Sequence, residues 1–123
     1  MSYVKFKTPD KVKEQIVSAL DKVAQTRDSK IRKGMNETTK SIERGTAKLV
    51  IMAEDVTPPE ILFHVPILCE EKGIPYGYVS SKEDLGNAVR INVSSSAIGV
   101  ENEGSGNENL IRDLGNQLKN LNK

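Results

Sequence analysis

Several residue types are scarce in this sequence. It has no tryptophan, a single cysteine, Cys69, and a single histidine, His64. A lone cysteine cannot form an internal disulfide, and one cysteine with one histidine cannot supply the ligand set of a structural zinc site. We therefore expect no metal or other cofactor, and a reducing, cytoplasmic setting.

Long apolar stretches are missing as well. No apolar run approaches the ~20 residues needed to cross a bilayer. Residues 1–5 lack the apolar centre of a secretory signal. We expect no association with a membrane.

Aromatic residues make up only 4% of the chain, so the core must be built from aliphatic side chains. Hydrophobic residues reach 37%, which is enough for a core, and 123 residues suit one compact domain. We expect a single domain over residues 1–123 whose interior is filled by Leu, Ile and Val.

Charge is unevenly distributed, although the net charge is only +1. Residues 27–48 contain seven basic and three acidic residues, a local balance of +4, whereas residues 54–84 contain two basic and seven acidic residues, a balance of −5. A phosphate backbone responds to the local field rather than to the total charge. The chain is therefore expected to be bipolar, with one end suited to nucleic acid.

Apolar spacing and boundary residues predict five helical segments. These cover residues 10–23 with Asp10 as cap, 36–45, 60–73 with an interruption or restart at Pro66, 80–88 with Ser80 and Glu83 as a capping box, and 110–121.

Strands are expected at residues 47–53, 76–79 and 97–100, and residues 29–34 read either as a charged edge strand or as a loop. Residues 47–53 are nearly all apolar, as is typical of a strand covered on both faces. Helices alternating with strands around such a strand predict an α/β fold, a three-layer α/β/α sandwich with a small mixed four-stranded sheet.

The segment most suited to chemistry is residues 33–40. Gly34 permits a close backbone approach, and the helix start that follows offers unpaired N–H groups to a phosphate. Asn36, Glu37 and Lys40 are spaced so that all three can point the same way. Together they match a guanine edge, because Glu37 can accept from N1–H and N2–H while the other two donate to O6 and N7.

A simpler interpretation of the same segment stays open. Asn36 could be only a helix N-cap, and Glu37 and Lys40 only a solvated pair on the helix surface.

The chain closely resembles the family of the archaeal large-subunit ribosomal protein L-seven-Ae, over about residues 10–122. The resemblance is carried by Lys33-Gly34-Met35-Asn36-Glu37-Thr38-Thr39-Lys40, Arg44-Gly45, Ile51-Met52-Ala53-Glu54-Asp55, Pro58-Pro59-Glu60, His64-Val65-Pro66-Ile67-Leu68-Cys69-Glu70-Glu71-Lys72-Gly73-Ile74-Pro75-Tyr76 and Leu85-Gly86.

This resemblance implies binding to the kink-turn, an RNA duplex bent at a three-nucleotide bulge beside tandem sheared G·A pairs. It implies that Asn36, Glu37 and Lys40 read the two guanines, and that residues 89–93 cover the bulge, with Ile91 against an extruded nucleotide. The expected RNA-binding residues are Lys33, Gly34, Asn36, Glu37, Lys40, Arg44, Val89, Arg90, Ile91 and Val93.

The resemblance also implies a set of partners. These are ribosomal RNA, box C/D and H/ACA guide RNA and ribonuclease P RNA, together with other ribonucleoprotein subunits that dock away from the basic end. The free chain is expected to be monomeric and to catalyse nothing.

Two other function classes compete with this interpretation. An enzyme could combine Glu54 and Asp55, at the end of the central strand, with His64 or Cys69. We expect His64 and Cys69 to be packed or capping residues instead, because apolar residues flank both, and Asp55 to serve a turn or cap. A protein-docking module that uses the acidic half of the chain remains a third possibility.

Overall fold

The computed structural model describes residues 2–123. Ten elements follow one another along the chain: α1 (Asp10–Gln25), β1 (Lys30–Lys33), α2 (Met35–Glu43), β2 (Leu49–Ala53), the short 3-10 helix η1 (Pro59–Leu62), α3 (His64–Lys72), β3 (Tyr76–Val79), α4 (Lys82–Ala88), β4 (Ala97–Asn102) and α5 (Glu108–Leu121).

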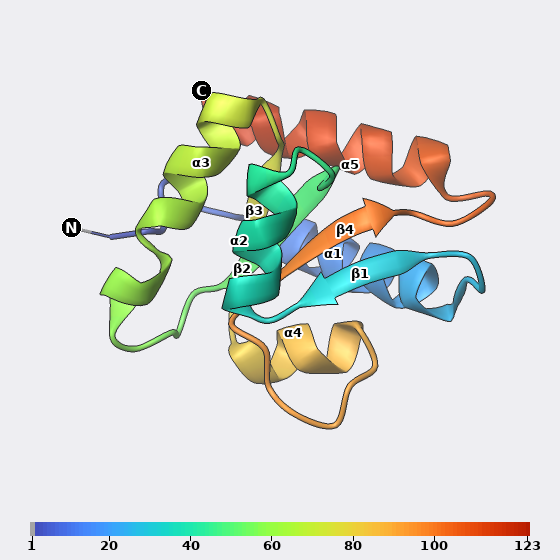
Figure 1. Ribbon diagram of the computed structural model, residues 1–123, viewed down its shortest axis with the longest axis horizontal. Helices are drawn as coiled ribbons and strands as arrows, with labels where there is room; N and C mark the ends of the chain where they lie inside the picture. Colours follow the sequence, from blue (N-terminus) through green and yellow to red (C-terminus); the bar gives the residue numbers. More distant parts are fainter. Residues whose placement is uncertain (1) are drawn as a thin grey trace.

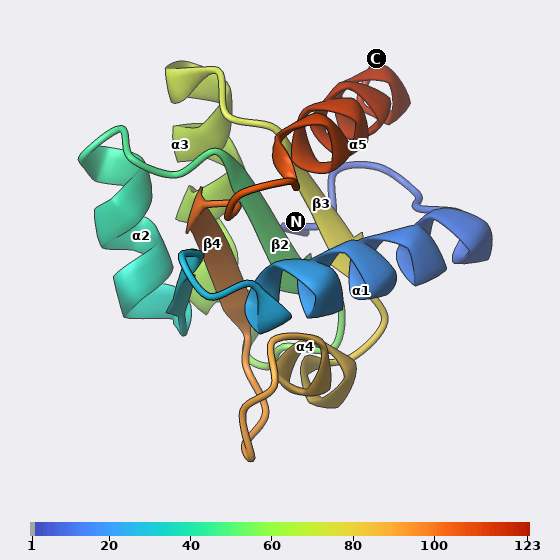
Figure 2. The same ribbon diagram turned by 90° about the vertical axis from the view of Figure 1, so that its right-hand side faces the viewer.

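The strands form one mixed sheet in the order β1-β4-β2-β3. β2 is parallel to β3, and β4 is antiparallel to both β1 and β2. Helices α2 and α3 lie on one side of the sheet and α1 and α5 on the other, with α4 at one end (Figure 2). The predicted three-layer α/β/α sandwich is confirmed. No helix within residues 2–123 is both long and apolar enough to span a bilayer.

The centre of the core is β2, whose five residues are all buried. Its side chains are covered on one face by α2 and α3 and on the other by the helices behind the sheet, which is why its sequence is apolar without alternation. Full burial of each Val, Leu or Ile side chain contributes about 1.5–3 kcal/mol. This strand therefore anchors the fold, as its composition predicted.

Segment 29–34 resolves as an edge strand, because β1 pairs with β4 alone. The proline-rich segment also behaves as predicted. Pro59 opens η1, and the chain restarts at His64 as α3, with Pro66 in the first turn where no backbone donor is needed. Gly73 ends α3 in the left-handed conformation, with φ of 70°.

Two predicted helix caps are wrong by one residue. Asp10 is the first residue of α1. The cap position is occupied by Pro9, whose side chain has no atom that could accept a hydrogen bond from the helix N–H groups. The cap of α4 is Ser81 rather than Ser80, and its hydroxyl accepts from the Asp84 N–H at 3.0 Å. At α4 the two adjacent serines satisfy the same sequence pattern, so only the backbone conformation selects between them. At α1 the acidic residue lies in the first turn instead, where its charge suits the positive end of the helix.

One end of the sheet gathers segments that are distant in the sequence. Because β4 is antiparallel to both β1 and β2, and β2 is parallel to β3, strands β1, β2 and β3 run in the same direction. Their carboxyl ends therefore lie at the same end of the sheet. The start of α2 and the loop of residues 89–96, which connects α4 to β4, lie together at that end (Figure 1). Carboxyl ends of parallel strands are where α/β folds usually bind ligands.

Candidate nucleic-acid interface

Gly34 forms the entry to α2. It occupies the cap position with φ of 97°, a conformation that L side chains rarely adopt, and a Cβ there would touch nothing within 4 Å. Its N–H donates to the Ala97 carbonyl at 2.9 Å, and the Thr38 hydroxyl donates to its carbonyl at 2.7 Å. These bonds fix the helix start against β4 and leave the first-turn N–H groups facing outward, since those groups have no intrahelical acceptor.

Asn36 lies exposed in the first turn of α2, and its side chain makes no hydrogen bond to any of residues 2–123. The cap position belongs to Gly34, so the interpretation of Asn36 as a mere N-cap is wrong. The surface pair, in contrast, exists, because the Lys40 ammonium lies 3.5 Å from a Glu37 carboxylate oxygen. Both side chains remain about half exposed, at 55% and 46%. The helix therefore presents one amide, one carboxylate and one ammonium to solvent.

Arg32 is a neighbour of Glu37 that the motif did not assign. Its guanidinium lies 3.9 Å from a Glu37 oxygen, and its Nε donates to Glu101 at 3.1 Å. Glu101 also accepts from the Ser41 and Thr46 hydroxyls, each at 2.7 Å. Residue spacing gave no signal for this set, since β1 and β4 meet only in the folded sheet.

Glu101 is an ionised carboxylate set beneath α2, with only 10% of its side chain exposed. Burial acts to raise its pKa, but hydrogen bonds from Thr46, Ser41 and Arg32, with the Arg32 charge, outweigh it and hold the pKa at about 2. The carboxylate fixes the direction of Arg32, and Arg32 in turn balances the charge of Glu37.

The loop of residues 89–96 is tied to α4 by backbone hydrogen bonds. Ile91 N–H donates to the Gly86 carbonyl at 3.1 Å, and Ser95 N–H donates to the Lys82 carbonyl at 3.0 Å. The approach is so close that a Cβ on Gly86 would lie 2.2 Å from the Val93 oxygen. The loop is therefore held in one position by the helix that precedes it.

The side chains of residues 89–93 point in different directions. Val93 is the most exposed of the three apolar side chains, at 69%, whereas Ile91 is half-buried and packs on the core. Arg90 has φ of 61°, and its Nε donates to the Asp21 carboxylate on α1 at 2.8 Å. Val89 is only 2% exposed, so its assignment as a contact residue is revised: it supports the loop from below.

The structure brings most of the expected residues to one end of the molecule. Gly34 and Ala97, at the start of α2 and the end of the loop, are joined by a hydrogen bond, so the two halves are adjacent. Arg44 is the exception. It is the C-cap of the nine-residue α2, and at ~1.5 Å per residue it lies on the order of 13 Å from the helix start.

The residues of the enzyme interpretation are committed to structural contacts. Glu54 pairs with Lys13 at 2.6 Å, and Asp55 accepts from the Lys82 N–H at 2.9 Å. His64 shares a hydrogen bond of 2.9 Å with the Thr39 hydroxyl, which joins α3 to α2. Burial raises the pKa of the Cys69 thiol to about 12, which leaves it protonated and unreactive at neutral pH.

No acid–base or nucleophilic arrangement results from these four residues. Within residues 2–123 there is also no group of three His, Cys, Asp or Glu side chains that could hold a metal ion.

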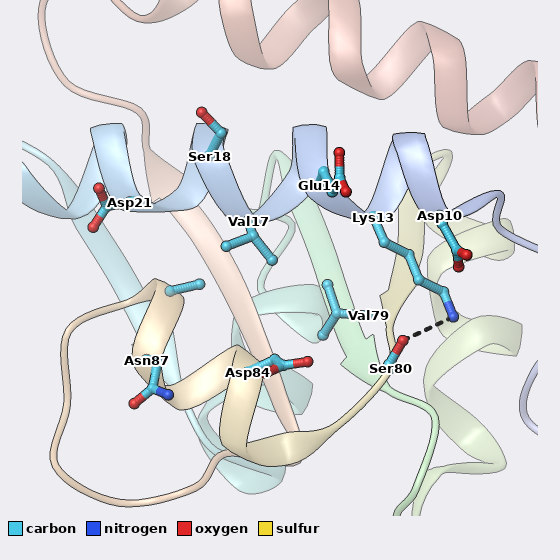
Figure 3. Close-up of a pocket in the computed structure, with 11 residues that line it drawn as sticks. Asp10, Lys13, Glu14, Val17, Ser18, Asp21, Val79, Ser80, Asp84 and Asn87 are labelled. Atoms are coloured by element: carbon cyan, nitrogen blue, oxygen red, sulfur yellow. Dashed lines mark hydrogen bonds between the residues drawn. The ribbon is translucent and has the colours of Figure 1, made fainter.

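A cavity of about 670 Å³ lies between α1, the end of β3 and α4, and no residue of α2 lines it. Figure 3 shows carboxylates of Asp10, Glu14, Asp21 and Asp84 around it, with Lys13 directed to the Ser80 hydroxyl at 3.1 Å. A surface so rich in carboxylates repels phosphate. Three of these carboxylates belong to α1, whereas the sequence pattern placed the acidic half of the chain at residues 54–84, which contributes Asp84 to this lining.

Comparison with known proteins agrees with this geometry. The model of the "Ribosomal protein L7Ae/L30e/S12e/Gadd45 family" matches residues 14–109. The solved structure of a Giardia lamblia 15.5kD RNA binding protein is similar with a TM-score of 0.82 and 30% sequence identity, over 94% of this chain and 93% of that one. These relatives are structural and RNA-binding proteins rather than enzymes, which agrees with the expectation that the chain catalyses nothing.

Proposed function

Because the chain belongs to the ribosomal protein L7Ae/L30e/S12e/Gadd45 family, we propose that it binds RNA and that its target is the kink-turn. The observation that carries the proposal is the start of α2, where Asn36, Glu37 and Lys40 stand exposed together beside the loop of residues 89–96.

Base recognition rests on Glu37. In the free protein its carboxylate is balanced by Lys40 at 3.5 Å and Arg32 at 3.9 Å. Exposed pairs of this kind contribute only ~0–1 kcal/mol, so they can rearrange at little cost. When a sheared G·A pair leaves the guanine edge open, Glu37 accepts from N1–H and N2–H, and Asn36 and Lys40 donate to O6 and N7.

Backbone contacts surround this reading site. Gly34 allows a phosphate to approach the outward N–H groups of the first turn of α2, and the positive end of the helix dipole favours the anion. Lys33 precedes it at the end of β1, with its side chain exposed. Arg44, at the far end of α2, contacts a more distant part of the RNA.

The loop of residues 89–96 covers the bulge. Val93 and the exposed part of Ile91 offer an apolar surface to an extruded nucleotide, and Val89 keeps the loop seated on the core. In this proposal Val93 supplies more of the contact than Ile91, because more of its side chain is exposed.

The same RNA shape occurs in several particles. We propose that the chain acts in the cytoplasm as a monomer that joins the large ribosomal subunit, and that it also serves as a core subunit of box C/D and H/ACA guide-RNA particles and of ribonuclease P. Other subunits of these particles would dock on surfaces away from the basic end.

A gel-shift experiment tests the proposal. Purified protein is titrated against a kink-turn hairpin and against the same hairpin with its sheared G·A pairs converted to Watson–Crick pairs. The expected result is a large preference for the first RNA, because conversion hides the guanine edges and straightens the duplex. Equal affinity for the two hairpins would refute shape-specific binding.

A further inference from the structure

A polar groove lies beside the proposed interface, between the end of α1 and the edge strand β1. Its volume is about 280 Å³, and its lining consists of Ala24, Gln25, Thr26, Arg27, Ser29, Ile31, Lys33 and Val89. Two members of this lining are basic and none is acidic. The groove therefore combines positive charge with a hollow shape.

The two basic residues that line the groove, Arg27 and Lys33, form no ion pair with the described residues 2–123. Four other basic residues of the segment 27–48 pair with carboxylates within 4 Å, namely Lys30, Arg32, Lys40 and Lys48. Arg27 and Lys33 make no ion pair and no side-chain hydrogen bond with any of residues 2–123, and both are exposed. Their positive charge is therefore available to a ligand.

The carboxylate next to Arg27 in sequence is held by hydrogen bonds to another segment. Asp28, next to Arg27, accepts from the Ser105 N–H at 3.0 Å and from its hydroxyl at 2.6 Å. The groove also borders the carboxyl end of α1, whose dipole would oppose an anion. Thr26 reduces that effect, because its hydroxyl donates to the Lys22 carbonyl at 2.9 Å and its N–H donates to the Val23 carbonyl at 3.0 Å.

The groove continues the proposed interface on two sides. Lys33 directly precedes Gly34, and Val89, in the groove wall, opens the loop of residues 89–96. From Ser29 to Lys33 the chain advances four residues, which at ~3.3 Å per residue is roughly 13 Å. A strand of RNA leaving the start of α2 can therefore follow β1 into the groove.

We propose that this groove holds the sugar–phosphate backbone of a stem that leads out of the kink, with Arg27 and Lys33 each contacting a phosphate. The inference rests on the proposed function and adds Arg27 to it. Long and unpaired cations suit phosphates, because contacts to the backbone draw mainly on charge and do not depend on base sequence. Gln25 and Ser29 line the same hollow and can serve the ribose hydroxyls.

The test is the Arg27→Ala variant with three RNAs. One is a kink-turn with two long stems, and the others carry the same kink-turn with one stem or the other shortened. Loss of one phosphate contact makes the slope of log affinity against log salt shallower by about 0.9. Lowering the salt from 200 to 50 mM should therefore raise the affinity of wild type roughly threefold more than that of the variant. This difference should persist for the full RNA and disappear when the stem in the groove is shortened.

Two controls accompany the variant. Lys22→Ala removes an exposed cation of α1, close to Arg27 in sequence but outside the groove lining, and it should bind as wild type does. Arg27→Lys should restore most of the salt dependence, because a phosphate needs the charge. Thermal melting should show both Arg27 variants folded, since this side chain makes no ion pair or hydrogen bond with the described residues 2–123.

The outcomes separate this inference from the proposed function. Suppose that wild type prefers the kink-turn while Arg27→Ala binds each of the three RNAs as tightly as wild type does. In that case the groove does not contact the RNA. A loss that is the same for every stem length, or a change in base preference, also overturns the backbone assignment. If wild type shows no preference for the kink-turn, the proposed function fails and the inference with it.

Discussion

At the scale of single residues, Glu37 and Arg44 lie at opposite ends of α2 and should play different roles. Replacing Glu37 by Ala removes the only carboxylate at the start of the helix. We expect kink-turn binding to weaken by about 1–3 kcal/mol and guanine preference to relax. Arg44→Ala should weaken binding by a similar factor for every RNA, because its exposed guanidinium offers charge alone.

The measurement is binding of both variants to kink-turns in which each sheared guanine is replaced in turn. If the two variants lose affinity with the same dependence on base identity, the division into base-reading and backbone residues is incorrect.

Glu101 provides a prediction about pH. Its pKa is held at about 2, below its ordinary value of 4.5. A carboxyl with a lowered folded-state pKa adds stability that is complete above pH 4.5 and is lost as pH falls toward 2. Glu101→Gln should therefore lower stability at neutral pH by about 2 kcal/mol, since hydrogen bonds to a charged group are lost.

Acid unfolding followed by circular dichroism checks this prediction. The wild type and Glu101→Gln curves should converge between pH 4.5 and 2. Glu83→Gln is a suitable control, because this exposed carboxyl makes no ion pair within residues 2–123. Parallel curves at a constant offset would mean that Glu101 acts through packing rather than through its charge.

The same residues mark the limit of sequence-based prediction. Asn36, Glu37 and Lys40 were recognisable because they lie within one turn of a helix that the pattern predicted. Glu101 and Arg32 were not, because their contact joins positions 69 residues apart and depends on the register of two strands. Val89 was named as a contact because the resemblance assigned the whole of residues 89–93 to the RNA, and a resemblance by segment does not say which side chain faces the core.

At the scale of elements, the loop of residues 89–96 depends on one glycine. Gly86→Ala would place a Cβ 2.2 Å from the Val93 oxygen and 3.2 Å from the Ser94 Cα, and both are backbone atoms that cannot turn aside. The loop must then move off α4, at a cost of roughly 1–3 kcal/mol. We expect weaker kink-turn binding from a protein that remains folded.

Hydrogen exchange locates the effect. The Ile91 and Ser95 amides, which donate to the Gly86 and Lys82 carbonyls, should exchange faster in Gly86→Ala. Gly99→Ala is the matched control, because a Cβ at this buried position meets its neighbours at an ordinary 3.7 Å or more. Unchanged exchange and unchanged affinity in Gly86→Ala would show that the loop position does not matter for binding.

Elements were more predictable than their ends. The period of apolar residues placed all five helices, and composition alone identified β2 as the buried strand. The predicted caps of α1 and α4 were each displaced by one residue, because an acidic residue suits the first turn as well as the cap, and adjacent serines carry the same signal. Residues 29–34 could not be assigned until the pairing of β1 with β4 was known, since edge strands need no apolar face.

At the scale of the whole molecule, the two parts of the interface are rigidly related. The hydrogen bond from Gly34 to the Ala97 carbonyl joins the start of α2 to the strand that follows the loop, and these positions are 63 residues apart in sequence. No local pattern predicts such proximity, which follows from the strand order β1-β4-β2-β3. A rigid surface can satisfy both sets of contacts only with an RNA whose shape already matches it.

We therefore expect the protein to capture a bent RNA rather than to force the bend. A ligand shifts an equilibrium only by its difference in affinity for the two forms. The ratio of the protein's affinities for the bent and the extended RNA must then equal the factor by which saturating protein raises the ratio of bent to extended molecules. Glu37→Ala, which loses base contacts made only to the bent form, should reduce both factors equally.

Fluorescence transfer between dyes on the two stem ends measures the bent fraction as protein is added. In a buffer chosen so that the free RNA is mostly extended, wild type should raise the bent fraction strongly, and Glu37→Ala should raise it less. An RNA that keeps its extended distance when fully bound would contradict capture. Equal bending by both variants would separate bending from base recognition, and α2 would then hold the RNA by its backbone alone.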